Sequence, residues 1–476
     1  MMFTVEEAER YRKETAQYGS VLGLDNMQHL MEELGQVLEE LNVIHVAGTN
    51  GKGSVCAMIA SILQQEQYKI GKYTSPKVFT EEEQYEINEE PITKERFAQI
   101  TWEIKNACVR IVEKGFQHPT LFEIETAAAI LWFYEEQCDF VLLETGLGGA
   151  LDATNIIRNP ICSVITSVSM DHMGFLGDTL SNIAQAKAGI IKEGCPVVTV
   201  LQKPAVMEVL KQACEEKHAT LTIADCERAT NIRMEEHSLF FDWEEFENVC
   251  LSLIGAYQVE NSICAITTIQ ILNQYLIERV KMEDIGNEKI GVRHTKNEKL
   301  GMRNIGIKRK ITPKAIKAGL AKAKWSGRFE CICQQPLIII DGAHNESAVE
   351  KLRETLEMGF TNWNIIYIIG VLRDKEYEKI LKCMLPLAQK AYTVTPSHER
   401  ALDGNTLCEI AGKFHEDVTF SKSVEEAVHG AIETACVDVE PSSSGTLILA
   451  FGSLSYLADV KIAVQKEDKG WLTKKK

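Results

Sequence analysis

The sequence predicts an α/β fold with two domains, and three observations support this prediction. The first is length, because 476 residues exceed a single ordinary hydrophobic core. The second is the alternation of short apolar runs with amphipathic segments, which is typical of parallel sheets covered by helices. The third is AGTNGKGS, residues 47–54, a glycine-rich turn between an apolar run and a helical pattern, as in phosphate-binding loops.

The first predicted domain, residues 1–325, contains this P-loop and a mainly parallel sheet. Apolar residues at Val55, Met58, Ile59 and Ile62 predict a helix directly after the loop. The short apolar runs elsewhere have the character of buried parallel strands. The predicted strands are 43–46, 70–74, 140–144, 163–169, 196–200 and 221–224, and further predicted helices are 181–192 and 204–216.

The second predicted domain, residues 326–476, is a smaller Rossmann-like α/β unit. Before it, residues 280–311 are polar and basic without periodicity, and we interpret them as a mobile insertion that precedes a helix at 312–325. The predicted strands are 336–341, 364–370, 390–395, 417–420 and 446–451, and the predicted helices are 346–358, 376–389, 404–414 and 424–435.

Composition limits the classes of function. The net charge of −17 argues against a nucleic-acid-binding surface. The 14 cysteines include no C-x-x-C pair, and Cys331 and Cys333 are expected to alternate on a strand, which favours reduced thiols over a zinc site. The N-terminal segment is too polar for a signal peptide, and no apolar run reaches the roughly 18 residues of a membrane span. We therefore expect a soluble cytoplasmic protein without nucleic-acid or membrane partners.

The loop departs from the common nucleotide pattern G-x-x-x-x-G-K-[ST]. Val46 stands five positions before Gly51, and Gly53 separates Lys52 from Ser54. Glycines allow consecutive N–H groups to face one anion, the lysine supplies a charge for terminal phosphates, and the serine hydroxyl suits Mg²⁺. A glycine turn without a ligand is the alternative, but a lysine and a serine together at the helix start favour phosphate binding.

Strand ends in the first domain carry further candidate groups. Glu144 ends an apolar strand, where parallel sheets deliver metal ligands, although an acidic strand end before a turn explains it equally well. Its glycine-rich continuation predicts a loop able to close on substrates. His172 follows another strand, where histidines are more often hydrogen-bonded loop residues, and Lys187 on a polar helix is ordinarily a solvated charge. The coincidence of these groups with the P-loop favours function.

The second domain repeats this arrangement. Asp341 and His344 lie in a glycine-containing turn after a buried strand, which is a ligand-binding position in such folds. A helix capped by Asn345, with an incidental histidine, is an equally weighted alternative. Arg328 lies near the predicted domain junction, where it suits a phosphate or an ordinary salt bridge.

In combination, these features resemble the Mur ligase superfamily and, within it, the folylpolyglutamate synthase/dihydrofolate synthase family. AGTNGKGS is a specific signature of that family. Ten matching stretches follow in the family's order from about residue 20 to residue 350. They are GLDNMQHLMEELG, VIHVAGTNGKGSV, YTSP, INEEPIT, FEIETAAAI, LLETGLGGALDATN, DHMGFLGDTL with KAGIIK, GAYQVEN, WSGRF and DGAHN.

The resemblance implies an ATP-dependent acid–amino-acid ligase that adds L-glutamate to the glutamyl carboxylate of a tetrahydrofolate. ATP phosphorylates that carboxylate, and the amine of the incoming glutamate then displaces phosphate from the acyl phosphate. A carboxylate is a poor acyl donor, and phosphorylation supplies the leaving group. Mg²⁺, lysine and loop N–H groups offset the repulsion between carboxylate and triphosphate. Dihydropteroate is a further candidate acceptor.

The resemblance also implies roles for individual residues, including carbamylation of Lys187 by CO₂ and closure of the domains on ATP. The implied phosphate-loop residues are Thr49, Asn50, Gly51, Lys52, Gly53 and Ser54. The implied ligands are Ser54, Ser75 and Glu144 for a first Mg²⁺, and Glu144, His172 and Lys187 for a second. The implied catalytic residues are Lys52, Glu144, His172 and Lys187, and the further nucleotide contacts are Asn261, Arg328, Asp341 and His344.

Some positions depart from the family's pattern. Lys77 replaces a histidine in TSPH, Gln84 replaces an arginine, and Tyr257 replaces a histidine in H-Q-x-x-N. The alternatives are a Mur-type ligase with a different carboxylate acceptor and a divergent nucleotide-binding protein without ligase activity. A kinase or GTPase would not need the second domain's DGAHN, and an N-K-x-D guanine signature is missing. We expect a monomer acting on small-molecule substrates.

Overall fold

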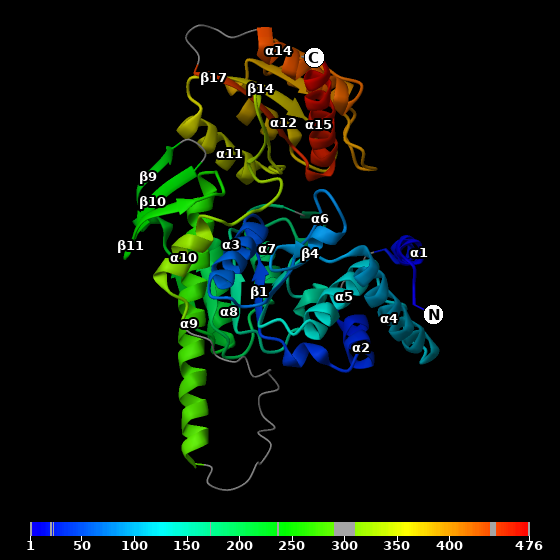
Figure 1. The fold of residues 1–476 in the computed structure, drawn as a ribbon, viewed down its shortest axis with the longest axis vertical. Coiled ribbons are helices and arrows are strands. Elements are labelled where there is room, and N and C mark those ends of the chain that lie inside the picture. Colours follow the sequence, from blue (N-terminus) through cyan, green and yellow to red (C-terminus); the bar gives the residue numbers. More distant parts are fainter. Residues whose placement is uncertain are drawn as a thin grey trace. The chain divides into compact units, whose positions relative to one another are not determined.

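The computed structural model describes residues 2–19, 21, 23–171, 173–235, 238–289, 310–437 and 444–474 (Figure 1). The chain divides into two compact units, both of them α/β as predicted. The first unit comprises residues 1–229, 243–249 and 260–323, and the second comprises 230–242, 250–259 and 324–476.

The described part of the first unit contains an eight-stranded sheet in the order β4-β3-β2-β5-β1-β6-β7-β8. Strands β2, β5, β1, β6, β7 and β8 are parallel, whereas β3 and β4 form an antiparallel edge. The mainly parallel sheet is therefore confirmed. Its strands are β1 (Val43–Ala47), β2 (Ile70–Tyr73), β3 (Tyr85–Ile87), β4 (Glu90–Pro91), β5 (Phe140–Glu144), β6 (Cys162–Ile165), β7 (Val197–Val200) and β8 (Leu221–Ala224).

Helices bury the apolar strands of this sheet. One core cluster joins α2, α4 and α5 to β1, β2 and β5, and a second joins α7 and α8 to β6 and β7. Strands β1 and β5 are buried along their whole length, as central parallel strands require. The helices are α1 (Val5–Thr15), α2 (Asp25–Glu33), α3 (Lys52–Gln65), α4 (Lys94–Glu113), α5 (Leu121–Glu135), α6 (Met173–Leu176), α7 (Leu180–Ala188), α8 (Pro204–Glu216), α9 (Tyr257–Lys289) and α10 (Pro313–Leu320).

Two features of the fold differ from the prediction. An antiparallel sheet of β9 (Thr230–Glu235), β10 (Ser238–Trp243) and β11 (Phe246–Leu251) was not expected, because these strands follow one another without the intervening helices of a parallel α/β sheet. The predicted insertion at 280–311 begins inside α9, which continues to Lys289 because lysine, methionine and glutamate favour helix. Figure 1 shows α9 as one long helix. Residues 290–309 of the predicted insertion lie outside the described residues.

The described part of the second unit contains a six-stranded sheet in the order β12-β13-β17-β14-β15-β16. All neighbours are parallel except β12 and β13, and a register shift between Cys331 and Cys333 interrupts their expected alternation. The strands are β12 (Glu330–Gln334), β13 (Leu337–Ile340), β14 (Trp363–Ile369), β15 (Lys390–Thr393), β16 (Val418–Phe420) and β17 (Gly445–Phe451). The helices are α11 (Glu346–Gly359), α12 (Tyr377–Met384), α13 (Gly404–Ala411), α14 (Val424–Val437) and α15 (Leu457–Lys474).

All 14 cysteines are free thiols, as the sequence predicted, and seven of them are buried. Within the described residues, no helix is both long and apolar enough to cross a membrane.

Candidate active site

The P-loop connects β1 to α3, and two of its glycines are required by close contacts. Gly48 has φ +155°, and a side-chain carbon there would lie 1.8 Å from Thr166 Oγ1. Gly51 has φ +90°, and a carbon there would lie 2.3 Å from Asn261 Oδ1. Positive φ and the absence of space both select glycine. The loop is therefore packed against the chain after β6 and against α9.

Hydrogen bonds fix the P-loop to the segment after β6. The Thr49 hydroxyl donates to Ser169 O (3.1 Å), while Thr49 N donates to Ser167 O (2.7 Å). The Asn50 side-chain amide lies 3.4 Å from Ser169 Oγ, and Thr166 Oγ1 donates to Asn50 O (2.7 Å). The side chains of Thr49 and Asn50 thus hold the loop in place. Helix α3 then starts at Lys52, with Gly51 as its N-cap and no side-chain cap.

Two lysines and one carboxylate converge on this loop. Lys52 Nζ and Lys187 Nζ both donate to Gly48 O, at 3.2 and 2.7 Å. Lys52 Nζ also lies 3.7 Å from Glu144 Oε1. Glu144 ends β5 and pairs in register with Val46 of β1, so the sheet itself brings the carboxylate beside the loop. The structure therefore brings together three of the residues that the sequence predicted: Lys52, Glu144 and Lys187.

Lys187 is almost fully buried, at 4% exposed. Burial and the nearby positive charge of Lys52 lower the pKa of the Lys187 amine to about 7, although Asp171 and Asp152 oppose this shift. The carbonyl groups of Ala186 and Lys187 leave no space for a side chain at Gly149, and Ala150 N donates to Ala186 O (2.7 Å). The predicted glycine-rich closing loop thus packs directly on α7, which carries Lys187.

The hydroxyl candidates lie at the same edge of the sheet. Ser54 lies in the first turn of α3 and is 2% exposed. Ser75 is partly exposed and follows β2, whose Tyr73 pairs with Leu143 of β5. His172 lies outside the described residues. Among those described, no group of three or more His, Cys, Asp or Glu side chains could hold a metal.

Asp341 of the second unit is a buried acceptor. Its carboxylate accepts from Phe329 N (2.8 Å), Ala343 N (2.8 Å) and the Tyr257 hydroxyl (3.1 Å). Burial raises the pKa of Asp341, and the Arg328 guanidinium opposes the shift. Tyr257, which departs from the family's pattern, thus donates a hydrogen bond to Asp341, a predicted nucleotide contact.

The turn after β13 also positions Arg328 and His344. Gly342 N donates to Gly327 O (2.8 Å), and a side-chain carbon at Gly342 would lie 2.1 Å from Arg328 Nη1. His344 Nδ1 lies 2.8 Å from Gly342 O, which requires the proton on Nδ1. Asn345 Oδ1 accepts from Ala348 N (2.9 Å) and caps α11, so this part of the alternative interpretation is correct.

The remaining departures belong to a charged cluster that the sequence analysis missed. Lys77 pairs with Glu81, and Gln84 is buried with its amide 3.5 Å from Glu81 O. Arg12 and Glu125 complete the cluster. A signal was present, because Glu125 lies in a mainly apolar helical run, FEIETAAAILWF, in which Glu123 and Thr126 are the other polar residues, and a buried carboxylate needs a compensating cation or several donors.

Comparison with known families matches both units. Residues 46–269 match the Mur ligase middle domain, and residues 327–454 match the Mur ligase glutamate ligase domain. The P-loop, Glu144 and Lys187 lie in the first match, and Arg328, Asp341 and His344 lie in the second. Fold and site together define an ATP-dependent ligase of the Mur type.

Individual relatives narrow this class. The chain is 33% identical over 472 residues to the dihydrofolate synthase/folylpolyglutamate synthase of Bacillus subtilis, covering 97% of this chain and 99% of the relative. It is 34% identical to the dihydrofolate synthetase of Saccharomyces cerevisiae, covering 78% and 81%. The folylpolyglutamate synthase of Mycobacterium tuberculosis, solved with ADP and AMPPCP, superposes with a TM-score of 0.81 at 25% identity, covering 97% and 99%.

The chain belongs to the folylpolyglutamate synthase/dihydrofolate synthase family. The resemblance inferred from the motifs is thereby confirmed, as is the prediction of an ATP-dependent acid–amino-acid ligase. These matches favour the folate ligase over a Mur-type ligase with another acceptor and over a protein without ligase activity.

Proposed function

We propose that this chain uses ATP to add L-glutamate to the glutamyl carboxylate of a reduced folate, and that dihydropteroate is a further acceptor. The observation that carries the proposal is the convergence of Lys52 and Lys187 on Gly48 O, beside Glu144. A triphosphate and a carboxylate repel each other, and a cation at the P-loop, here Lys52, offsets that repulsion. The names of the relatives in Bacillus subtilis and Mycobacterium tuberculosis support the same reaction.

The proposed reaction has two steps. The folate carboxylate oxygen attacks the γ-phosphorus of ATP, the bond to the bridging oxygen breaks, and ADP leaves with its electron pair. The glutamate amine then attacks the acyl carbon, phosphate leaves, and the amine loses a proton as the amide forms. Lys52, whose Nζ lies at the P-loop, neutralises charge on the transferred phosphoryl group. Loss of one such contact lowers a reaction rate by orders of magnitude.

The donors near the P-loop fit Mg²⁺, which prefers oxygen ligands. Glu144 supplies a buried carboxylate, and the Ser54 hydroxyl is buried in the first turn of α3. These two groups, together with Ser75, would hold the first ion, and Glu144, His172 and Lys187 would hold a second. The metal would supply charge neutralisation for the phosphates of ATP.

Carbamylation of Lys187 is part of the proposal. The lowered pKa of about 7 leaves a large share of the Lys187 amine uncharged near neutrality, and the uncharged amine is the form that attacks CO₂. A new N–C bond forms and one proton is released, which converts a cation into an anionic oxygen ligand. With ¹³C-labelled bicarbonate, NMR of the wild type should show a carbamate carbon that Lys187→Met lacks, and its absence from the wild type would exclude the modification.

The other predicted roles belong to the same proposal. Asn261, Arg328, Asp341 and His344 are proposed as further contacts of the nucleotide. Residues 1–325 form the proposed ATP-binding domain, which contains the match to the Mur ligase middle domain. Residues 326–476 form the proposed glutamate ligase domain. The protein acts as a cytoplasmic monomer, in keeping with its 14 free thiols. Size-exclusion chromatography with light scattering tests the monomer.

The central test is mass spectrometry of reactions that contain the protein, Mg-ATP and L-glutamate with tetrahydrofolate, with dihydropteroate or with neither. The proposal predicts an acceptor heavier by one glutamyl residue and one ADP released per addition. ATP consumption without an acceptor should be negligible. If neither acceptor gains glutamate, the proposed function is wrong.

A further inference from the structure

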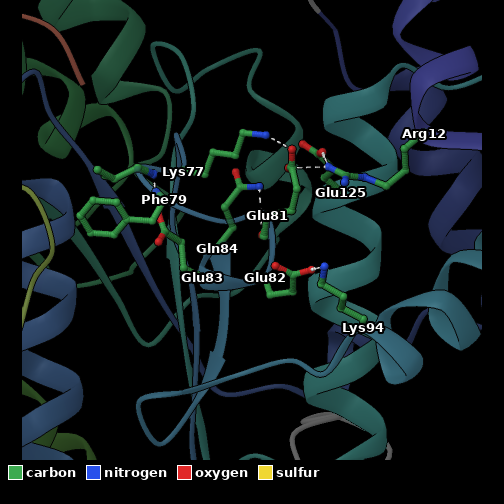
Figure 2. A network of polar contacts seen from close by, with 10 residues as sticks. Arg12, Lys77, Phe79, Glu81, Glu82, Glu83, Gln84, Lys94 and Glu125 are labelled. Carbon is green, nitrogen blue, oxygen red and sulfur yellow. Dashed lines mark hydrogen bonds and ion pairs between the residues drawn. The ribbon is translucent and has the colours of Figure 1, made fainter. Parts of the chain in front are cut away.

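The segment between β2 and β3, residues 74–84, carries Ser75 and folds on itself. Thr74 N donates to Gln84 O (3.1 Å), which closes its base. The Glu83 carboxylate accepts from Phe79 N (2.9 Å) and from Val78 N, which fixes the turn between them. Figure 2 shows this segment beside α1 and α5. Internal bonds set the shape of the segment, and its attachment to the rest of the unit depends on other contacts.

Arg12 of α1 is one such attachment. Its Nη2 lies 2.9 Å from Glu81 Oε2 of the segment and also pairs with Glu125 Oε1 of α5 (Figure 2). The guanidinium carbon also lies 5.2 Å from the ring centroid of Phe97 in α4. The side chains of Arg12 and Glu125 are each 11% exposed, and that of Glu81 is 35% exposed. One cation thus ties three helices to one segment.

The chemistry of the cluster explains why this cation is needed. A buried carboxylate such as that of Glu125 is costly unless a cation or several donors compensate it. Gln84 is buried but neutral, so it does not compensate the charge of Glu125. Lys77 pairs with Glu81, and its side chain is 48% exposed. Among the described residues, Arg12 is therefore the cation paired with Glu125.

We propose that Arg12 is a positioning residue that holds the segment 74–84, and with it Ser75, against α5. The planar guanidinium bridges two carboxylates, which a lysine ammonium does less well. Glu125 anchors the cation in the unit, and Glu81 connects the segment to it. Because Ser75 is a ligand for Mg²⁺ in the proposed function, this inference predicts that Mg²⁺ dependence responds to Glu81 and Arg12. That consequence rests on the proposed function, while the attachment of the segment does not.

Glu81→Gln separates this role from a general structural one. It removes the pairs of Glu81 with Arg12 and with Lys77 but leaves the buried Arg12–Glu125 pair in place. Glu82→Gln is the matched control, because Glu82 is in the same turn and pairs with Lys94 at 4.0 Å rather than with Arg12 (Figure 2). Both variants exchange one carboxylate for an amide of the same shape.

Two measurements are made on each full-length variant: hydrogen exchange of residues 74–84, and the Mg²⁺ concentration that gives half the maximal rate of glutamate addition. Glu81→Gln should speed exchange in this segment and raise the Mg²⁺ requirement by about two- to fivefold, the scale of one partly exposed ion pair. Glu82→Gln should change neither. Arg12→Gln should have the larger effect, with partial recovery in Arg12→Lys.

The outcomes distinguish this inference from the proposed function. Equal exchange in Glu81→Gln and Glu82→Gln would overturn the positioning role, whether or not Arg12→Gln folds. Faster exchange in Glu81→Gln, with a Mg²⁺ requirement that neither Glu81→Gln nor Ser75→Ala changes, would support the attachment and remove Ser75 from the metal site. If the wild type adds no glutamate, the proposed function fails, and the exchange comparison still decides the role of Arg12.

Discussion

The loop after β1 and the loop after β13 have the same arrangement but opposite chemistry. Each follows a fully buried parallel strand and leads into a 14-residue helix, α3 or α11. In α/β folds this is the position at which ligands bind. The two loops differ in how the start of the following helix is completed.

The loop after β13 provides its own polar partners. Asn345 caps α11, and the Asp341 carboxylate takes three donors from its own unit. The loop after β1 instead ends in Gly51 without a side-chain cap, and two lysines point at its Gly48 carbonyl. The positive end of a helix and the Lys52 ammonium complement an anion. Loss of Lys52 in the first loop should therefore act mainly on catalysis, and loss of one hydrogen bond to Asp341 in the second should act mainly on stability.

Lys52→Ala is the strongest test of this contrast. It leaves the triphosphate charge unmatched at the P-loop, and we expect turnover to fall by about 10³-fold or more. The rate of glutamate addition measures the effect, and thermal unfolding checks that the variant folds. Lys69→Ala is the control, because Lys69 lies outside the loop. Its Nζ pairs with Glu136 Oε2 at a distance of 2.8 Å. Near-normal activity of Lys52→Ala would remove Lys52 from its role.

Gly51→Ala tests whether the shape of the first loop matters as much as its charge. The added carbon would lie 2.3 Å from Asn261 Oδ1 at φ +90°, so both strain and a clash arise. Gly115→Ala is the control, because Gly115 has φ +86° and nothing within 4 Å. We expect about 1 kcal/mol of lost stability for Gly115→Ala from strain alone. Gly51→Ala should lose more stability in urea unfolding and most of its activity, and equal losses would contradict the clash.

The pH dependence of stability tests the buried amine beside the first loop. The folded pKa of Lys187 is about 7, below its ordinary value of 10.5, so the folded chain binds fewer protons between these values. This contribution to stability therefore rises with pH across that window, by about 5 kcal/mol at most. In CO₂-free buffer, urea unfolding of the wild type should show this rise relative to Lys187→Met. If the free energy of unfolding of the two proteins changed equally with pH, the lowered pKa of Lys187 would be wrong.

The sequence predicted the sheets well because buried parallel strands are short apolar runs. Strands β5 and β8 have the predicted bounds, since apolar character ends sharply at each terminus. The sheet of β9, β10 and β11 was missed because its strands follow one another directly, without the helices that separate the parallel strands. The continuation of α9 to Lys289 was missed because helix propensity there acts without an apolar stripe.

The candidate site was predictable only where residues lie near one another in the sequence or at neighbouring strand ends. Lys52 and Glu144 follow from the P-loop and from the parallel pairing of β1 with β5. The contact of Arg12 with Glu81 and Glu125 joins positions far apart in the sequence, and no local pattern specifies such a contact. The lowered pKa of Lys187 likewise depends on burial of its side chain. The sequence of a polar helix does not show which of its lysines is buried.

Tyr257→Phe is the mildest test and addresses the second loop. It removes one of three donors to Asp341 and leaves Phe329 N and Ala343 N, so we expect a stability loss of about 1 kcal/mol in urea unfolding. Glutamate addition should change by less than about threefold, because the loop keeps its remaining hydrogen bonds.

Tyr367→Phe is the control for this change, because the Tyr367 hydroxyl is buried in β14 without a hydrogen-bond partner among the described residues. Removing an unsatisfied hydroxyl costs nothing in hydrogen bonding, so Tyr367→Phe should be neutral or stabilising. If Tyr257→Phe were as mild as this control yet lost most of its activity, the second loop would act on the reaction directly. Both loops would then contribute to the reaction, and they would differ only in the polar groups that each one supplies.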